Sequence, residues 1–191
     1  MTTPFQKNAR DVRYWYSMAT KLDRAAKVLA REIEADLQRL EEEAPDASAV
    51  LTAAQVPGIQ MADGFWLLAA FSLENLLKGI LVAREPDLVQ EQRLEKPLCS
   101  HRLLEMARRA HLDVNVIEAF FLEVASEYST WAGKYPVPRQ RRPSRTFTHL
   151  FSAGDLVAYN ALYSRFEAEL HALGGREAMY VRMGNPGRKG A

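Results

Sequence analysis

The fold is decided by one stretch of the sequence, residues 65–83, which read FWLLAAFSLENLLKGILVA. Apolar side chains occur there on nearly every face that an α-helix would present. The pattern predicts a helix over about residues 61–84 that other helices surround on all sides. Gly79 costs about 1 kcal/mol relative to alanine inside a helix. We therefore expect Gly79 to mark a point where a neighbouring helix crosses closely.

This stretch is long enough to span a membrane, but its middle is polar. Glu74, Asn75 and Lys78 lie there, and a charge at the centre of a bilayer costs about 2.5–3.5 kcal/mol. Glu74 and Lys78 are four residues apart, a spacing that brings opposite charges together on one helix face. We interpret Glu74 and Lys78 as structural polar residues, paired in the core of a protein that does not enter a membrane.

A second long helix is expected before this stretch, over about residues 11–43. Its apolar residues follow one another at steps of three and four, which places them on one face of the helix. They are Trp15, Met18, Leu22, Ala26, Leu29, Ile33, Leu37 and Leu40. The opposite face is charged and should contact water, and Pro45 ends the helix.

Three shorter helices complete the prediction, over residues 101–110, 113–133 and 152–174. Each begins at a residue type that caps helix N-termini. These residues are Ser100, Asp113 and Ser152, the last followed by Asp155 in a weak capping-box pattern. The expected fold class is all-α: an up-and-down bundle of about five helices over residues 1–174. The glycine pair at 174–175 ends the last helix, and residues 175–191 are expected to form a mobile C-terminal tail.

The composition limits the chemistry of the chain. Its 191 residues, 48% of them hydrophobic, suit one folded domain. The single cysteine, Cys99, allows neither an internal disulfide nor a cysteine-based zinc cluster, and it suits the reducing cytoplasm as the expected location. The N-terminus lacks the apolar core of a secretory signal. No histidine has a second metal-ligating histidine nearby, and no glycine-rich phosphate loop is present, so we expect no metal and no cofactor.

Positive charge is concentrated in one short segment, although the net charge of the chain is only +1. Between residues 134 and 145 there are five cations and no acidic residue. They are Lys134, Arg139, Arg141, Arg142 and Arg145. Such a cluster can bind a phosphate backbone, and the neighbouring rings of Tyr135 and Phe147 could stack on bases. The alternative is a solvated loop whose charge balances the acidic first helix.

Four features occur in an order that resembles the HEPN superfamily of helical bundles. The first is a long helix with an early aromatic residue and an apolar stripe. The others are AFSLENLLK at residues 70–78, SHRLLEMA at residues 100–107, and Lys-Tyr-Pro at residues 134–136 before a last helix. The resemblance covers about residues 12–173. It implies that His101 is a structural residue whose ring packs at the start of a helix.

The resemblance also suggests a possible catalytic pair. Catalytic HEPN proteins are metal-independent ribonucleases in which an arginine binds the phosphate and a nearby histidine transfers a proton. Six residues separate Arg142 and His149, which matches the family's spacing. Pro143 stands where the family has a polar residue, and Lys134 stands where it has an arginine. An imidazole titrates near neutral pH, and a guanidinium holds a phosphate with two prongs, so the residue types suit RNA cleavage.

Members of the superfamily are often dimers that act in defence, toxin–antitoxin and RNA-metabolism systems. The resemblance therefore implies a homodimer and, as partners, a cognate antitoxin or a nucleotidyltransferase. Three functions follow as hypotheses. The first is binding of RNA or a nucleotide through the basic segment, the second is endoribonuclease activity of Arg142 and His149, and the third is a non-catalytic protein-interaction module.

Overall fold

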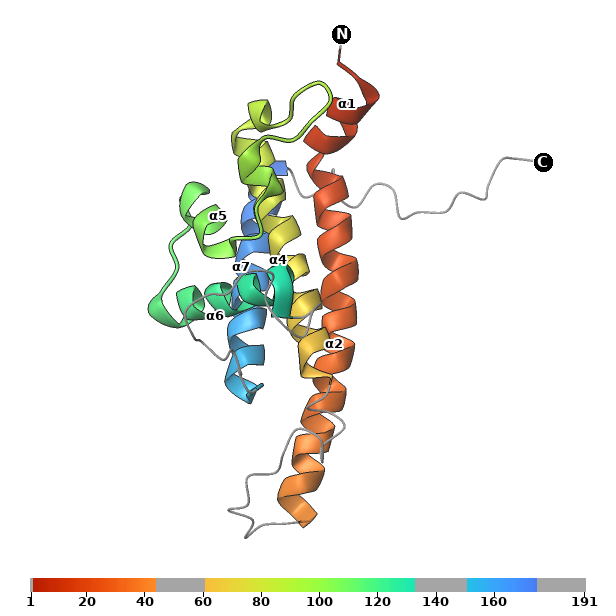
Figure 1. Cartoon of the computed structure of the whole chain (residues 1–191), viewed down its shortest axis with the longest axis vertical. Helices are drawn as coiled ribbons and strands as arrows, with labels where there is room; N and C mark the ends of the chain where they lie inside the picture. The colour runs from red at the N-terminus through yellow and green to blue at the C-terminus, as the bar shows by residue number, and fades with distance from the viewer. Residues whose placement is uncertain (1, 44–60, 133–150, 175–191) are drawn as a thin grey trace, which may run out of the picture.

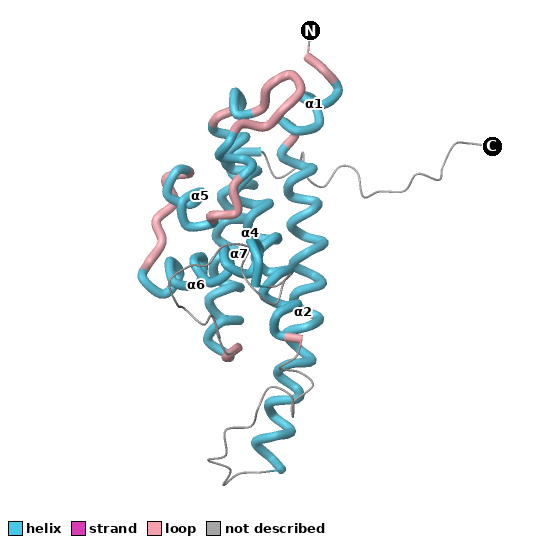
Figure 2. The backbone as a smooth tube through the Cα atoms, in the orientation of Figure 1, coloured by secondary structure: helices cyan, strands magenta, loops and turns pink. Residues whose placement is uncertain are grey.

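The computed structural model describes residues 2–43, 61–132 and 151–174, which form α-helices joined by short connections (Figures 1 and 2). No strand occurs in these ranges, so the all-α prediction is confirmed there. Their α-helices are α1 (Pro4–Arg10), α2 (Val12–Glu43), α4 (Ala62–Arg84), α5 (Leu103–Arg109), α6 (Val116–Glu127) and α7 (Ala153–Gly174). Two 3-10 turns, η2 (Pro86–Leu88) and η3 (Lys96–Cys99), and a π-helical turn, η4 (Tyr128–Ala132), complete the described elements.

Helices α2, α4 and α7 form the long axis of the bundle (Figure 1). Helix α2 runs antiparallel to α4, because residues early in α2 meet residues late in α4. The facing pairs are Trp15–Gly79, Ala19–Ser72 and Leu29–Gly64. Helix α7 runs parallel to α4, as the pairs Ser72–Tyr159 and Gly79–Leu170 show. The described helices therefore do not alternate strictly up and down, since α5 and α6 return the chain to the end where α4 began.

Helix α4 is covered on nearly all sides, as its composition predicts. Phe65, Trp66, Leu73, Leu77 and Ile80 are fully buried. The helix also has the length and hydropathy of a membrane span, but most of its apolar window is buried inside the bundle. The core of a water-soluble protein passes the same test, so length and hydropathy alone carry no conclusion about a membrane.

The buried face of α2 is rotated from the predicted stripe. Met18, expected on the packed face, is 47% exposed, whereas Ala19 and Ala30, outside the predicted stripe, are buried; Ala26 and Ile33 are buried as predicted. Small side chains at the alanine positions allow the backbones of α2 and α4 to approach closely, which a stripe of large residues would prevent. The apolar pattern of α2 was wide enough to hide this rotation, because apolar residues also occur outside the contact.

Gly79 lies at a close crossing of the helices, as its position in the sequence suggested. A Cβ atom placed on Gly79 would lie 3.1 Å from Leu170 of α7 and 3.1 Å from the Cβ of Trp15 on α2. Both distances are shorter than normal carbon contacts of about 3.5–4.0 Å. The missing side chain therefore lets α2 and α7 contact α4 at the same level.

The starts of helices α1 and α6 differ from the sequence prediction, whereas that of α7 does not. Helix α1 was not predicted, although Thr3 and Gln6 form a capping box around Pro4. Helix α6 is capped by Asn115, with Glu118 completing the box, and not by Asp113. Helix α7 begins as predicted, since the Ser152 amide donates to Asp155 Oδ2 at 2.7 Å.

The start of α5 is capped from another part of the chain. The helix begins at Leu103 and not at His101, and Ser100 accepts a bond from the Arg102 amide (3.1 Å) without capping the helix. The Leu103 amide donates instead to Ser126 Oγ of α6 at 2.9 Å. A helix start that another helix satisfies leaves no signature in the local sequence.

A polar network joins the three long helices inside the core. The Tyr159 hydroxyl of α7 donates to Asp23 Oδ1 of α2 (2.9 Å) and lies 3.2 Å from Ser72 Oγ of α4. Ser72 donates to the carbonyl of Ala19, and Lys27 donates to Asp23 Oδ2 at 2.9 Å. Each polar group is thus satisfied, which burial requires. The pKa of Tyr159 is raised well above its ordinary value. Burial is the largest cause, and the negative charge of Asp23 is the next.

This raised pKa predicts a loss of stability at alkaline pH. An unfolded tyrosine releases its proton near pH 10, whereas the folded Tyr159 keeps it. Above pH 10 the free energy of unfolding should therefore fall by about 1.4 kcal/mol per pH unit through this group. In Tyr159→Phe, the free energy of unfolding should fall with pH less steeply than in wild type, by about 1.4 kcal/mol per pH unit. Urea unfolding followed by circular dichroism at several alkaline pH values measures the two slopes.

At pH 7 the Tyr159→Phe protein should lose about 1–2 kcal/mol, because Asp23 and Ser72 lose a hydrogen-bond partner. Tyr14→Phe is the control, since the Tyr14 side chain is 59% exposed and its loss of a hydroxyl should leave stability at pH 7 unchanged. An alkaline decline of the same slope in wild type and Tyr159→Phe would contradict the assignment.

Candidate functional site

A buried cluster of charged side chains in the described core lies on α4. Glu74 and Lys78 are one helical turn apart, and Lys78 Nζ lies 2.7 Å from Glu74 Oε1. Only 6% of the Glu74 side chain and 11% of the Lys78 side chain are exposed. Two charges at this depth require each other, because a single ion left in an apolar environment costs several kcal/mol.

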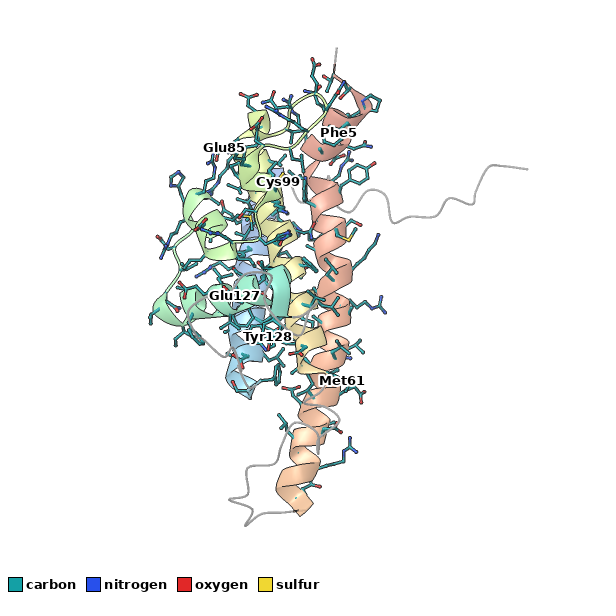
Figure 3. All side chains as sticks on the ribbon, viewed as in Figure 1. Phe5, Met61, Glu85, Cys99, Glu127 and Tyr128 are labelled. Atoms are coloured by element: carbon teal, nitrogen blue, oxygen red, sulfur yellow. The ribbon has the colours of Figure 1, made fainter. Side chains whose placement is uncertain are left out.

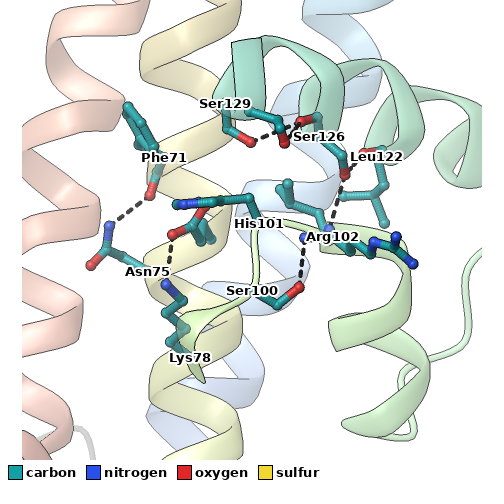
Figure 4. Close-up of polar contacts among 12 residues, drawn as sticks. Phe71, Asn75, Lys78, Ser100, His101, Arg102, Leu122, Ser126 and Ser129 are labelled. Atoms are coloured by element: carbon teal, nitrogen blue, oxygen red, sulfur yellow. Dashed lines mark hydrogen bonds and ion pairs between the residues drawn. The ribbon is translucent and has the colours of Figure 1, made fainter. Parts of the chain in front are cut away.

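His101 completes the cluster from the connection before α5. Its Nδ1 lies 2.8 Å from Glu74 Oε2, so the two carboxylate oxygens have one partner each. Figure 4 shows Lys78 and His101 converging on this carboxylate. The edge of the imidazole also packs against Phe71, with ring centroids 6.3 Å apart. These contacts attach the 100–102 connection to the middle of α4.

A second set of hydrogen bonds holds this connection from the other side. Ser126 Oγ accepts from the Leu103 amide and donates to the carbonyl of Leu122 at 2.6 Å. Ser129 and Thr130 donate to the carbonyl of Ser126, as Figure 4 shows for Ser129. The His101 connection is therefore fixed between α4 on one side and the α6–η4 junction on the other.

The chemistry open to this cluster follows from its exposure. The His101 side chain is 43% exposed, whereas the carboxylate that holds it is buried. A carboxylate that binds one ring nitrogen orients the other, the geometry that positions a histidine for proton exchange. Lys78 already neutralises the carboxylate, however, and all three groups link α4 to α5. The cluster is best described as a structural joint that presents one oriented imidazole at the surface.

The predicted basic and catalytic residues lie outside the described residues. These are Lys134, Arg139, Arg141, Arg142, Arg145 and His149. The predicted C-terminal tail, residues 175–191, also lies outside them. Within residues 2–43, 61–132 and 151–174, no group of three histidine, cysteine or acidic side chains could hold a metal ion. Cys99 is exposed and labelled in Figure 3.

The polar network of Asp23, Ser72 and Tyr159 was missed at the level of sequence. Asp23 was assigned to the wet face of its helix with the other charged residues. A signal was nevertheless present, because Asp23 falls between Ala19, Ala26 and Ala30 at helical spacing and lies four residues before Lys27. An acidic residue in a line of alanines indicates a polar group in a close helix contact.

Comparison with known proteins adds no relative. No protein-family model matches the chain, and no curated protein or solved structure matches it either. The resemblance to the HEPN superfamily therefore stays a prediction from the motifs of this chain.

The paired charges of α4 predict a large effect of removing one of them. Glu74→Gln keeps the shape of the side chain but leaves the buried Lys78 without an anion, so the free energy of unfolding should fall by about 3 kcal/mol. Glu74→Gln/Lys78→Met removes both charges and should recover most of this loss. Urea unfolding of the two variants and wild type measures both effects. A double variant no more stable than the single one would show that Lys78 does not depend on Glu74.

Proposed function

We propose that this chain binds RNA or a nucleotide through the basic segment of residues 134–149. Five cations without an acidic residue supply the charge that phosphate binding requires. Charge elsewhere is mixed, since 25 basic and 24 acidic residues nearly cancel over the whole chain. The basic segment is thus the part of the sequence best suited to attract a polyanion.

The observation that carries this proposal is the anchoring of the described residues on both sides of the segment. Before it, Tyr128 stacks on Trp66 with ring centroids 5.5 Å apart. After it, Phe151 packs edge-on against Phe65 at 5.0 Å. Phe65 and Trp66 are neighbours in the first turns of α4, so Tyr128 and Phe151, on either side of the segment in the sequence, contact the bundle at the same place. This arrangement supports a binding segment presented from a rigid base.

The HEPN-like part of the proposal rests on the motifs and is supported by their placement. The AFSLENLLK motif lies at the centre of α4, the most buried helix of the described chain. His101, from the second motif, lies at the approach to α5 and contacts the Glu74 carboxylate of the first motif. Two motifs that are separate in the sequence thus contact each other in the structure. This contact supports the interpretation that both motifs belong to one fold.

RNA binding predicts a loss of affinity that depends on where charge is removed. Arg139→Ala/Arg141→Ala/Arg142→Ala should weaken binding of a labelled single-stranded RNA, measured by fluorescence anisotropy, by on the order of tenfold or more. The slope of log affinity against log salt should fall by about 2, since each single-strand phosphate contact contributes about 0.7.

The matched control removes three exposed cations from elsewhere: Lys7→Ala/Lys96→Ala/Arg108→Ala. Both variants lower the net charge by the same amount, so only a local site separates them. Equal weakening in the two variants, or no binding by wild type at low salt, would refute the proposal.

A second candidate function is metal-independent RNA cleavage by Arg142 and His149, favoured by their spacing in the resembled motif. If this activity exists, wild type should cleave RNA in the presence of a chelator, because the chemistry needs only a proton-transferring imidazole and a phosphate-binding guanidinium. Single His149→Ala and Arg142→Ala variants should each lose at least about 100-fold in rate, as gel analysis of a labelled RNA would measure. If wild type leaves the RNA intact, the hypothesis of RNA cleavage is refuted. The proposal of RNA binding is not affected by that result.

The partners implied by the resemblance are a second copy of the chain and a cognate antitoxin or nucleotidyltransferase. A protein that binds neither RNA nor nucleotide but is recovered with such a partner would instead support the hypothesis of a protein-interaction module.

A further inference from the structure

The outer face of α2 carries a continuous stripe of exposed residues over most of the helix. We call it the outer stripe. Its members are Tyr14, Met18, Lys21, Ala25, Val28, Glu32, Ala35 and Arg39, all exposed. They follow one another at alternating steps of four and three residues, the heptad spacing of a coiled-coil seam. Tyr14, Met18 and Val28 expose 59%, 47% and 52% of their surface, so three large apolar side chains of the stripe lie on the outside of the helix.

The outer stripe lies on the side of α2 opposite the bundle. The residues that α2 buries against α4 include Ala19, Ala26, Ala30 and Ile33. At 100° per residue, these buried residues and the outer stripe are centred about 140° apart on the helix. Figures 1 and 3 show α2 along one edge of the molecule, with side chains projecting from the side that faces away from α4. Relative to residues 2–43, 61–132 and 151–174, every member of the stripe is exposed and accessible to another helix.

We propose that the outer stripe pairs with the same stripe of a second copy of this chain, in an antiparallel register. The two-fold axis of this pairing passes midway between Ala26 and Lys27. Every member of the stripe then faces another member across the axis. The four kinds of pair are Tyr14–Arg39, Met18–Ala35, Lys21–Glu32 and Ala25–Val28. The stripe spans roughly 38 Å at 1.5 Å per residue, enough for seven turns of helix contact.

The charges of the stripe favour this register over a parallel one. Antiparallel pairing places Lys21 opposite Glu32 twice, whereas parallel pairing in register would place each opposite its own kind. In the described part of the chain neither Lys21 nor Glu32 has an ion-pair partner. Arg39, whose own-helix partner is Asp36, would also lie over the ring of Tyr14, a favourable cation–π geometry.

The centre of the stripe has the size pattern of a close helix pair. Ala25 faces Val28 at the axis, and Met18 faces Ala35 further out, so a small side chain always meets a larger one. Such alternation lets two helices interdigitate. Arg24 and Arg31 flank the stripe and approach each other in this register, once on each side of the axis, so the seam has to outweigh two like-charge contacts. The inference does not depend on RNA binding, because α2 and the basic segment are separate parts of the chain.

Sedimentation velocity on the full chain over a range of concentrations tests the proposal. Wild type should dimerise, and Val28→Asp should raise the dimer dissociation constant by on the order of 100-fold, because it puts two charges beside the axis. Val116→Asp is the matched control: Val116 is 83% exposed on α6, outside the stripe, and its replacement should leave the dissociation constant unchanged. Circular dichroism should show that both variants remain folded, since both positions are exposed.

Charge exchange tests the orientation. Lys21→Glu and Glu32→Lys should each raise the dissociation constant by on the order of tenfold, since each replaces two opposite-charge pairs by two like-charge pairs. Lys21→Glu/Glu32→Lys should restore the wild-type value. A monomeric wild type, as when another segment of the chain covers the stripe, would overturn the proposal. So would a dimer that Val28→Asp leaves intact, or single exchanges without effect.

Discussion

Helix α4 has almost no face that can be left in water, and the rest of the bundle is arranged to cover it. Burying its large side chains contributes about 1.5–3 kcal/mol for each of them, so the chain gains most by enclosing this helix first. Enclosure by several helices needs close approach, which explains the glycine at position 79 and the alanines of α2. The contacts between the long helices therefore require small residues as well as apolar ones.

Enclosing α4 also buries three polar side chains, which together fix two relations between elements. Ser72 takes part in the network with Asp23 and Tyr159, which sets the axial positions of α2 and α7 along α4. Glu74, which Lys78 pairs with, contacts His101 and so sets the position of the connection before α5. A purely apolar helix could slide or rotate among its neighbours with little cost, whereas misplacing a satisfied polar group leaves it unpaired.

The sequence was informative where the signal is local. Periodicity, together with proline and glycine, located α2, α4 and α7 to within a residue or two, and the spacing of Glu74 and Lys78 suggested their pairing. The orientation of α2 was not accessible, because Met18 and Ala19 are both apolar and only the packing decides which is buried. The contact of His101 with Glu74 joins residues 27 positions apart, so no local pattern announces it. The basic segment remains a sequence prediction, since it lies outside the described residues.

The hydrogen bond from the Leu103 amide to Ser126 has a consequence for the order of assembly. Helix α5 has seven residues, and isolated helices shorter than about 12 residues are marginal in water. Its first turn is satisfied by a residue that a ribosome adds 23 positions later. During synthesis, α5 and the imidazole placed just before it must wait until α6 has emerged and docked. The joint on α4 is thus completed late, although two of its three members are made early.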